Sequence, residues 1–241
     1  MDYQSTCGQS GYMTSQLMTP LQQLRAGRLP ERFVQLMGGL VLYGISMGLM
    51  YRSTLGLDPW DVFHAGVASR IPLSFGQVVI VTGVAVLVLW IPLRQWPGLG
   101  TIANAIVIGL ATDAALASIG TPASLGGRTL MLVAGILLNA VATASYIGAQ
   151  LGPGPRDGLM TGLVARTGWS IRLVRTSIEL SVLVIGFLLG GTAGLGTVLY
   201  AVTIGPLVHI LLPRFTVPLD RPQEDPAMEW LREHRWSKPA W

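Results

Sequence analysis

The sequence contains the stretch Leu55-Gly56-Leu57-Asp58-Pro59-Trp60-Asp61 and, further along, the stretch Leu151-Gly152-Pro153-Gly154-Pro155-Arg156-Asp157. The glycines of the two stretches are 96 positions apart (152 − 56 = 96). Two unrelated apolar stretches would agree by chance at Leu and Val, whereas these agree at Gly, Pro and Asp. The same offset, without a gap, matches Gly66 with Gly162, Arg70 with Arg166, Ser74 with Ser170, Gly98-Leu99-Gly100-Thr101 with Gly194-Leu195-Gly196-Thr197, and Ile108-Gly109 with Ile204-Gly205. The sequence therefore predicts two copies of one structural unit.

The composition is that of a membrane protein. Of the 241 residues, 51% are hydrophobic and only 12% are charged, with a mean hydropathy of +0.54. A soluble domain carries about 25% charged residues. The apolar residues fall into runs of about 20, the helix length needed to cross a bilayer. Six membrane spans are predicted, at residues 33–51, 73–93, 99–119, 129–149, 171–189 and 195–212.

A shorter segment follows the first span of each copy, at 58–70 and at 154–166. The ten residues 60–69 make about 15 Å of helix, half the hydrocarbon thickness, so such a helix enters the membrane without crossing it. Asp58 before Pro59 is a helix-start pattern. Three crossings and one half-membrane helix per copy predict an all-α protein with inverted repeats. A short tilted full span would instead give parallel repeats, and a helix lying on the membrane surface is the third reading.

The chain divides into a polar N-terminal segment (1–32), repeat 1 (33–119), repeat 2 (129–212) and a C-terminal tail (213–241). The first 20 residues have no apolar stretch and do not resemble a signal peptide. Basic residues at both ends of the membrane region predict a multi-pass protein of the cell membrane with both termini in the cytoplasm. The tail forms an interfacial helix anchored by tryptophans or is disordered. The basic residues are Arg25, Arg28, Arg32, Arg214 and Arg221, and the tryptophans are Trp230, Trp236 and Trp241.

The two helix starts are candidate binding elements. A helix N-terminus carries about half a positive charge, and Arg156 adds a full one, so a small anionic solute is the expected ligand. Asp61 and Asp157 weaken this reading, because they can simply neutralise the same dipoles. The candidate substrate-binding residues here are Asp58, Trp60, Asp61, Arg156 and Asp157.

Arg175 and Glu179 stand four residues apart in the predicted fifth span. Charges at this depth cost at least about 2.5 kcal/mol each on insertion scales, so they should face the interior and pair. They either form a structural ion pair or act at the site, with Glu179 accepting a proton or coupling a cation. The counterpart of Glu179 in the first copy is Gly83, so the predicted site is asymmetric, framed by both copies and supplied with its chemistry mainly by the second.

Asp113 and His209 occupy equivalent positions and form a candidate titrating pair if the two copies meet. The alternative is that each is hydrogen-bonded or water-exposed near a helix end. His64 is matched by Met160 and is expected to pack or line the interior. No cluster of metal ligands accompanies it, and Cys7 is the only cysteine, so neither a metal site nor an internal disulfide is predicted.

The motifs of both helix starts resemble those of the YczE/YyaS/YitT family of bacterial integral membrane proteins, nearer its YczE branch. The resemblance is carried by 55–61, by 152–160, by Arg175 with Ile178-Glu179, and by the glycine-rich step at 190–197. It covers residues 33–212 and leaves both ends unmatched. The family is defined mainly by its membrane region, so the resemblance implies no catalytic residues.

A transporter or channel for a small solute or ion is the function that the paired, interrupted helices favour. The alternative is a membrane partner that regulates, stabilises or recruits another protein without transporting anything. An enzyme is not predicted, because the sequence lacks a nucleophile with a base and lacks a metal motif. No cofactor and no nucleic acid is expected. The lipid bilayer is the expected partner, and the sequence does not decide between a monomer, a homo-oligomer and a complex with another membrane protein.

Overall fold

The computed structural model describes residues 20–219, which include helices and connecting loops but no strand. The helices are α2 (Pro20–Arg25), α3 (Leu29–Ser53), α4 (Pro59–Ala68), α5 (Phe75–Leu93), α6 (Leu99–Ser118), α7 (Leu125–Gly148), α8 (Pro155–Thr167), α9 (Ile171–Leu188) and α10 (Leu195–Phe215). The prediction of an all-α protein is thus confirmed for this range. Cys7, most of the polar N-terminal segment and the tryptophans of the tail lie outside the described residues.

The helix starts recur at the offset found in the sequence. Helices α3, α4, α5 and α6 begin at residues 29, 59, 75 and 99, and α7, α8, α9 and α10 begin at 125, 155, 171 and 195, each 96 positions later. Local capping explains several starts. Ser74, Ser124 and Ser170 accept hydrogen bonds from backbone N–H groups in the first turns of α5, α7 and α9. Both short helices begin with proline at the first helical position.

Five helices, α3, α5, α6, α7 and α10, are long and apolar enough to cross a membrane. The prediction of a sixth span at 171–189 is only partly met: α9 forms there, but it is 18 residues long and carries Arg172, Arg175 and Glu179. Its three charged residues exclude it from this set of five helices. Large apolar side chains point outward from these helices, as expected of a surface that faces lipid, with Ile91 74% and Leu195 87% exposed.

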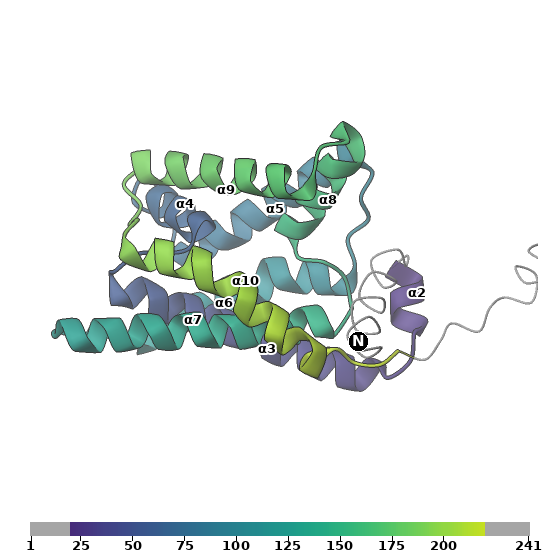
Figure 1. The fold of residues 1–241 in the computed structure, drawn as a ribbon, viewed down its shortest axis with the longest axis horizontal. Helices are drawn as coiled ribbons and strands as arrows, with labels where there is room; N and C mark the ends of the chain where they lie inside the picture. The colour runs from purple at the N-terminus through teal and green to yellow at the C-terminus, as the bar shows by residue number, and fades with distance from the viewer. Residues whose placement is uncertain (1–19, 220–241) are drawn as a thin grey trace, which may run out of the picture.

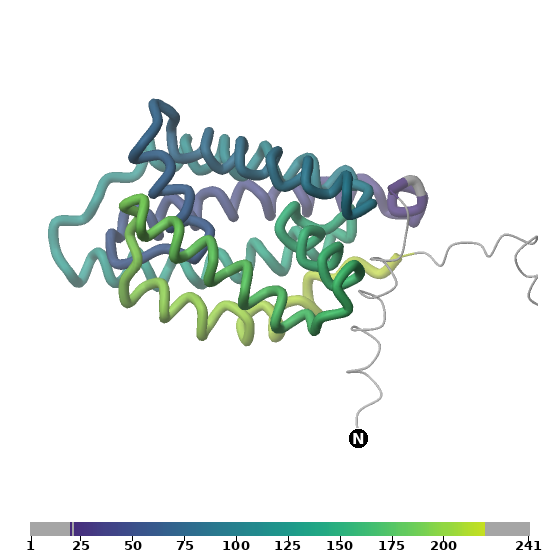
Figure 2. Tube along the Cα trace, turned by 90° about the horizontal axis from the view of Figure 1, so that it is seen from above, coloured from purple at the N-terminus to yellow at the C-terminus, as the bar shows by residue number. Residues whose placement is uncertain are grey.

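The helices form two layers (Figure 1). In one layer α3 packs along α7, with α6 beside α3 and α10 beside α7. In the other layer α4 packs on α9 and α8 packs on α5. Seen from above, α5 and α6 run along one edge of the molecule and α9 and α10 along the other (Figure 2). Each short helix therefore packs against a long helix from the other half of the sequence.

The glycine-rich steps before α6 and α10 hold the loops that lead into the short helices. Gly196 donates its backbone N–H to the carbonyl of Leu55 at 2.9 Å, and Gly100 donates to Leu151 at 2.7 Å. The hydroxyl of Thr101 adds a bond to the Pro153 carbonyl at 2.7 Å. These bonds bind each loop to a helix from the other half of the chain and fix where the short helix begins.

Arg32 is fully buried and joins the two ends of the described chain. Its guanidinium donates to the carbonyls of Gln23, Ala149 and Gln150 at 2.7 to 2.9 Å. The Gln150 side chain in turn donates to the carbonyl of Val217. The sequence placed Arg32 only among the basic residues at the start of the membrane region, and the structure shows that its charge satisfies carbonyls beyond the C-terminus of α7. Figure 1 shows α2 and the end of α10 at the same end of the bundle.

The two edges of the molecule differ in how tightly they close. Helix α5 packs along α6, whereas α9 and α10 make almost no contact. A Cβ added to Gly109 of α6 would overlap the carbonyl oxygen of Gly76 in α5. Position 172, the counterpart of Gly76, is arginine, and an added Cβ at Gly205, the counterpart of Gly109, would meet nothing within 4 Å. Small residues let α5 pack closely on α6, whereas large charged residues of α9 keep the edge between α9 and α10 open.

We predict opposite effects for alanine at these two equivalent glycines. Gly109→Ala should destabilise the protein by about 2 kcal/mol, because the new methyl group has no room between α5 and α6. Gly205→Ala should be neutral or stabilise by up to about 1 kcal/mol, because alanine favours the helix and fills open space. The thermal unfolding midpoints of both variants in detergent, compared with wild type, provide the test. Equal destabilisation by the two substitutions would contradict the difference between the edges.

Candidate functional site

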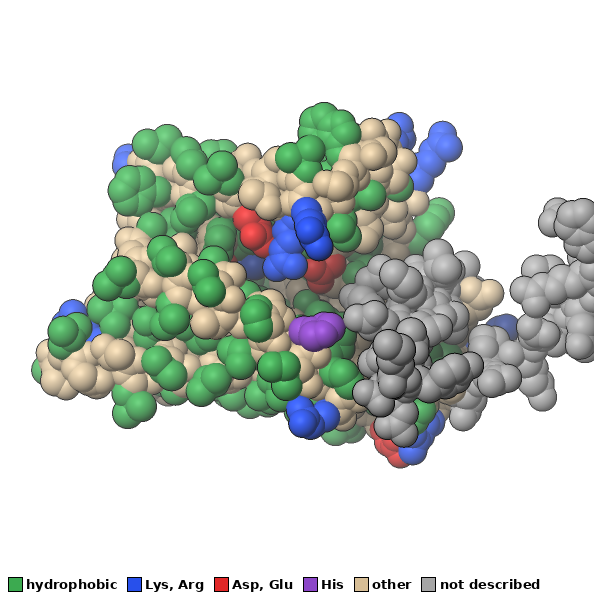
Figure 3. Space-filling model, in the orientation of Figure 1, with side chains coloured by type: hydrophobic (Ala, Val, Ile, Leu, Met, Phe, Trp, Pro, Cys, Tyr) green, Lys and Arg blue, Asp and Glu red, His purple; other side chains and the backbone are tan. Residues whose placement is uncertain are grey.

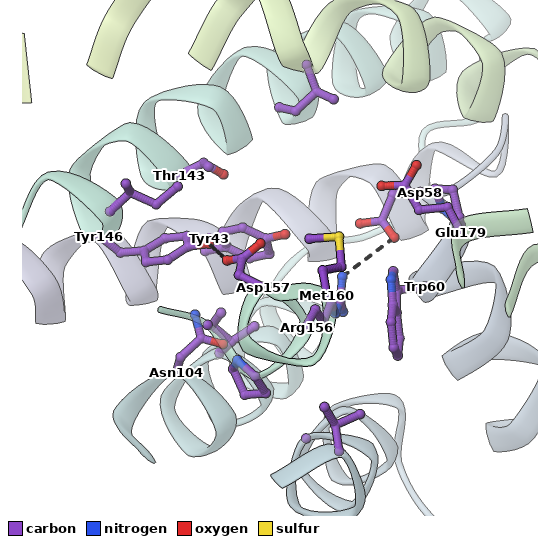
Figure 4. A pocket seen from close by; sticks show the side chains of 18 of the residues that line it. Tyr43, Asp58, Trp60, Asn104, Thr143, Tyr146, Arg156, Asp157, Met160 and Glu179 are labelled. Carbon is purple, nitrogen blue, oxygen red and sulfur yellow. Dashed lines mark hydrogen bonds and ion pairs between the residues drawn. The ribbon is translucent and has the colours of Figure 1, made fainter. Parts of the chain in front are cut away.

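A cavity of about 360 Å³ lies between the two layers, and the first turns of α4 and α8 both reach it. Its volume is within the range of about 300–1,000 Å³ usual for small-molecule sites. Figure 4 shows Tyr146 and Tyr43 on one side of the cavity, Trp60 and Asp58 on the other, and Arg156 between them. All helices from α3 to α10 contribute residues to the wall of this cavity. The chemically distinctive ones are Tyr43, Asp58, Trp60, His64, Tyr146, Arg156, Asp157, Arg175, Glu179, Tyr200 and His209.

Arg156 faces two carboxylates of α4. Its guanidinium nitrogens lie 4.0 Å from Asp58 Oδ1 and 3.9 Å from Asp61 Oδ1. Asp58 caps α4, since the same Oδ1 accepts the backbone N–H of Asp61 at 2.8 Å. Both carboxylates are buried, with Asp58 2% and Asp61 0% exposed. Electrostatic attraction between Arg156 and the two aspartates therefore links the start of α8 to the start of α4.

The first turn of α4 adds aromatic and imidazole groups to this cluster. The Arg156 guanidinium lies over the Trp60 ring, 4.8 Å from its centroid, which is a cation–π contact. His64 Nδ1 is 3.1 Å from Asp61 Oδ1, and its ring lies among Trp60, Phe63 and Phe75. His64 thus packs and lines the interior, as expected from the sequence.

The first turn of α8 is positioned by α5 and α7. The indole N–H of Trp90 donates to the carbonyl of Pro155 at 3.0 Å, and Gly158 leaves room for the Trp90 ring because an added Cβ would overlap it. The hydroxyl of Tyr146 donates to Asp157 Oδ2 at 3.3 Å. Asp157 is therefore held on the cavity wall, next to Arg156 in the chain but bonded to a different helix.

The cavity opens between α9 and α10. Arg175 Nε donates to Glu179 Oε1 at 2.9 Å, and these side chains are 55% and 39% exposed. His209 of α10 lines the same space. Figure 3 shows acidic, basic and histidine side chains gathered in a hollow between these two helices. The predicted pairing of Arg175 with Glu179 is confirmed, but the pair stands at an opening of the cavity rather than in a sealed interior.

Most of the predicted site residues come together. Asp58, Trp60, Arg156, Asp157, Arg175 and Glu179 all line the cavity, and Asp61 lies directly behind Asp58. Asp113 does not join them, because it accepts hydrogen bonds from Ser74 Oγ and from the Gly76 backbone N–H at the start of α5. His209 lines the cavity alone, so the structure does not bring Asp113 and His209 together as a pair.

Three tyrosines were missed by the sequence reading. Tyr43, Tyr146 and Tyr200 line the cavity, and the Tyr200 hydroxyl donates to Asn139 Oδ1 at 3.0 Å. Asn139 in turn donates to Ser46 Oγ at 2.9 Å, so it bonds across helices as a buried amide should. A phenolic hydroxyl in the middle of a membrane span needs a hydrogen-bond partner inside the protein. This requirement could have indicated from the sequence that these tyrosines face the interior. Within residues 20–219 no group of three or more His, Cys, Asp or Glu side chains is arranged to hold a metal ion.

The fold and the cavity define a helical multi-pass membrane protein. The sequence profile of DUF6198, a family of unknown function, matches residues 30–213, and the chain therefore belongs to this family. The resemblance drawn from the two helix starts is confirmed by two relatives in Bacillus subtilis. The chain is 32% identical to the uncharacterized membrane protein YczE over 73% of its own length and 83% of that protein, and 25% identical to the uncharacterized protein YyaS over 73% and 89%.

An uncharacterized protein of Haemophilus influenzae is 42% identical, over 73% of this chain and 81% of that protein. No solved structure matches the chain significantly. The relatives therefore establish the family and the membrane class.

We predict that Arg156 matters far more for stability than Arg175. Arg156→Ala leaves the buried carboxylates of Asp58 and Asp61 without a counter-charge and should destabilise the protein by about 3 kcal/mol. Arg175→Ala removes a half-exposed pair and should cost less than about 1 kcal/mol. Thermal unfolding of the purified variants measures both effects. Comparable losses for the two arginines would contradict the central position given to Arg156.

Proposed function

We propose that this protein is a transporter or channel for a small solute or ion, built from two inverted repeats. Helices α3 to α6 form the first repeat and α7 to α10 the second. The observation that carries the proposal is the central cavity at which two short helices begin. Interrupted helices whose ends meet at a midplane site are the usual binding elements of secondary transporters with inverted repeats.

The path of the chain supports half-membrane helices. Ser69 and Arg70, just after α4, donate to the carbonyl of Leu189, just after α9. The next helix, α10, begins beside the end of α3, since Gly196 donates its backbone N–H to the carbonyl of Leu55. The end of α4 therefore lies at the same end of the bundle as the end of α3. Arg166, near the end of α8, donates to the Pro92 carbonyl at the opposite end. Under this proposal α4 and α8 enter from opposite sides of the membrane and turn back.

The placement of the described chain ends supports termini on one side of the membrane. Gln23 and Val217 are joined through Arg32 and Gln150 at one end of the bundle. We propose that this end faces the cytoplasm of a cell-membrane protein, in agreement with the basic residues flanking the first and last spans.

The opening between α9 and α10 supports access to the cavity. Charged side chains are costly against hydrocarbon, so Arg175, Glu179 and His209 need a polar neighbour at that opening. Water or solute in the opening supplies it. The charged edge is then the moving or entrance side of the protein, and the closed α5–α6 edge is its fixed side.

Flux measurements on full-length protein in liposomes test the proposal. A panel of alkylamines, amino acids, carboxylates and inorganic ions is applied to proteoliposomes on a solid-supported membrane, and charge movement is recorded. At least one solute class should give a saturable signal that Asp157→Asn reduces by tenfold or more, on the order expected for a charged contact worth about 1.4 kcal/mol. Gly126→Ala, where an added methyl group meets nothing, is the matched control. Folded, inserted protein that moves none of these solutes would contradict transport.

A further inference from the structure

The charged cluster of Asp58, Asp61 and Arg156 is incompletely satisfied. A direct bond between a guanidinium and a carboxylate has a length of about 2.7–2.9 Å, but the shortest separations here are 4.0 and 3.9 Å. The Oδ2 atoms of both aspartates are buried and have no hydrogen-bond partner among the described residues. Leaving such atoms unpaired is costly. The carboxylate of Asp58 on the cavity wall therefore has an acceptor oxygen that lacks a hydrogen-bond donor.

The charge balance of the cavity favours a cation. Four carboxylates, from Asp58, Asp61, Asp157 and Glu179, stand in or directly behind the cavity wall. The wall carries two guanidiniums, from Arg156 and Arg175, and both already face these carboxylates. A negative excess in a weakly polar interior attracts positive charge strongly. The anionic solute suggested by the helix N-termini fits this balance poorly.

The aromatic lining favours an organic cation over a metal ion. The face of Trp60 already holds the guanidinium of Arg156, and three tyrosines line the rest of the space. Aromatic faces attract ammonium and guanidinium groups through the ring quadrupole. A cavity of about 360 Å³ is also far larger than a single ion requires. Arg156 is itself a guanidinium attached to the protein, so its contacts show the kind of cation that the site accommodates.

We propose that the cavity binds a small organic cation bearing N–H donors, a primary amine or a guanidinium, whose charged end binds Asp58 and the face of Trp60 in competition with Arg156. This inference rests on the proposed function, since it names the solute class of the same site. The N–H donors of the solute reach the unpaired carboxylate oxygen of Asp58, and its charge replaces that of Arg156 over Trp60. Occupancy then changes how the starts of α4 and α8 are held together.

Binding to full-length protein in detergent tests the proposal. Propylammonium and guanidinium chlorides are titrated at constant ionic strength and compared with their neutral counterparts, 1-propanol and urea, and with sodium acetate. Thermal unfolding and calorimetric titration are the readouts. Both cations should bind saturably, and the neutral molecules and acetate should not. Equal binding of urea and guanidinium, or preferential binding of acetate, would overturn the proposal.

Three variants separate recognition from a purely structural effect. Trp60→Phe should weaken cation binding at least about threefold, as expected for losing the better ring of a cation–π contact, and Asp58→Asn should weaken it more. Arg156→Gln should strengthen guanidinium binding at least about threefold, because it removes the competitor. Trp96→Phe, at a side chain 80% exposed, is the matched control and should change nothing. Monodisperse elution from a sizing column establishes that each variant is folded.

The outcomes distinguish this inference from the proposed function. Cation binding that Asp58→Asn and Trp60→Phe leave unchanged in folded variants, or an Arg156→Gln variant that binds guanidinium less tightly, would overturn the assigned site. Flux of another solute class without cation binding would overturn the inference alone. Specific cation binding without any flux would overturn the transport proposal and leave the binding site standing.

Discussion

The charge contact between the starts of α4 and α8 is the constraint on which the rest of the structure depends. Asp58 and Asp61 belong to a helix in the first half of the sequence, and Arg156 belongs to its counterpart in the second half. Buried charges of this kind are tolerated only when they face one another. The two short helices therefore begin close to one another, and the first turns of both lie on the wall of the cavity.

Hydrogen bonds between backbone groups hold the starts of the two short helices in place. The loop before each short helix is bonded to a glycine at the start of α6 or α10, with Leu55 accepting from Gly196 and Leu151 from Gly100. The halves then diverge at their long helices. Where α5 has glycines that let α6 approach, α9 has Arg172 and Glu179, and the α9–α10 edge stays open. The bundle thus has one closed edge, between α5 and α6, and one charged edge, between α9 and α10.

The sequence predicted the helices, the 96-residue spacing of their starts and the charged residues that line the cavity, because Pro, Asp and Gly at helix starts act locally. The Asp58 cap of α4 and the proline at the first helical position of α8 are examples. It did not predict that Arg156 lies over Trp60, since that contact depends on how two distant helices meet. For the same reason the sequence left open whether Asp113 and His209 meet, and in the structure Asp113 is instead hydrogen-bonded at the start of α5. The tyrosines that line the cavity were missed because a tyrosine within an apolar span does not indicate whether its side chain faces the lipid or the protein interior.

Side-specific labelling of single cysteines tests the central claim, that α4 and α8 enter the membrane and turn back, most directly. In a Cys7→Ser background, cysteines replace Trp96 and Trp169, which lie in connections between helices, and Gly126, in the first turn of α7, and an impermeant maleimide is applied from each side of sealed vesicles. If α8 turns back, positions 96 and 169 react from the same side and position 126 from the other. Reaction of position 169 from the side of position 126 would mean that α8 crosses the membrane and would contradict the account.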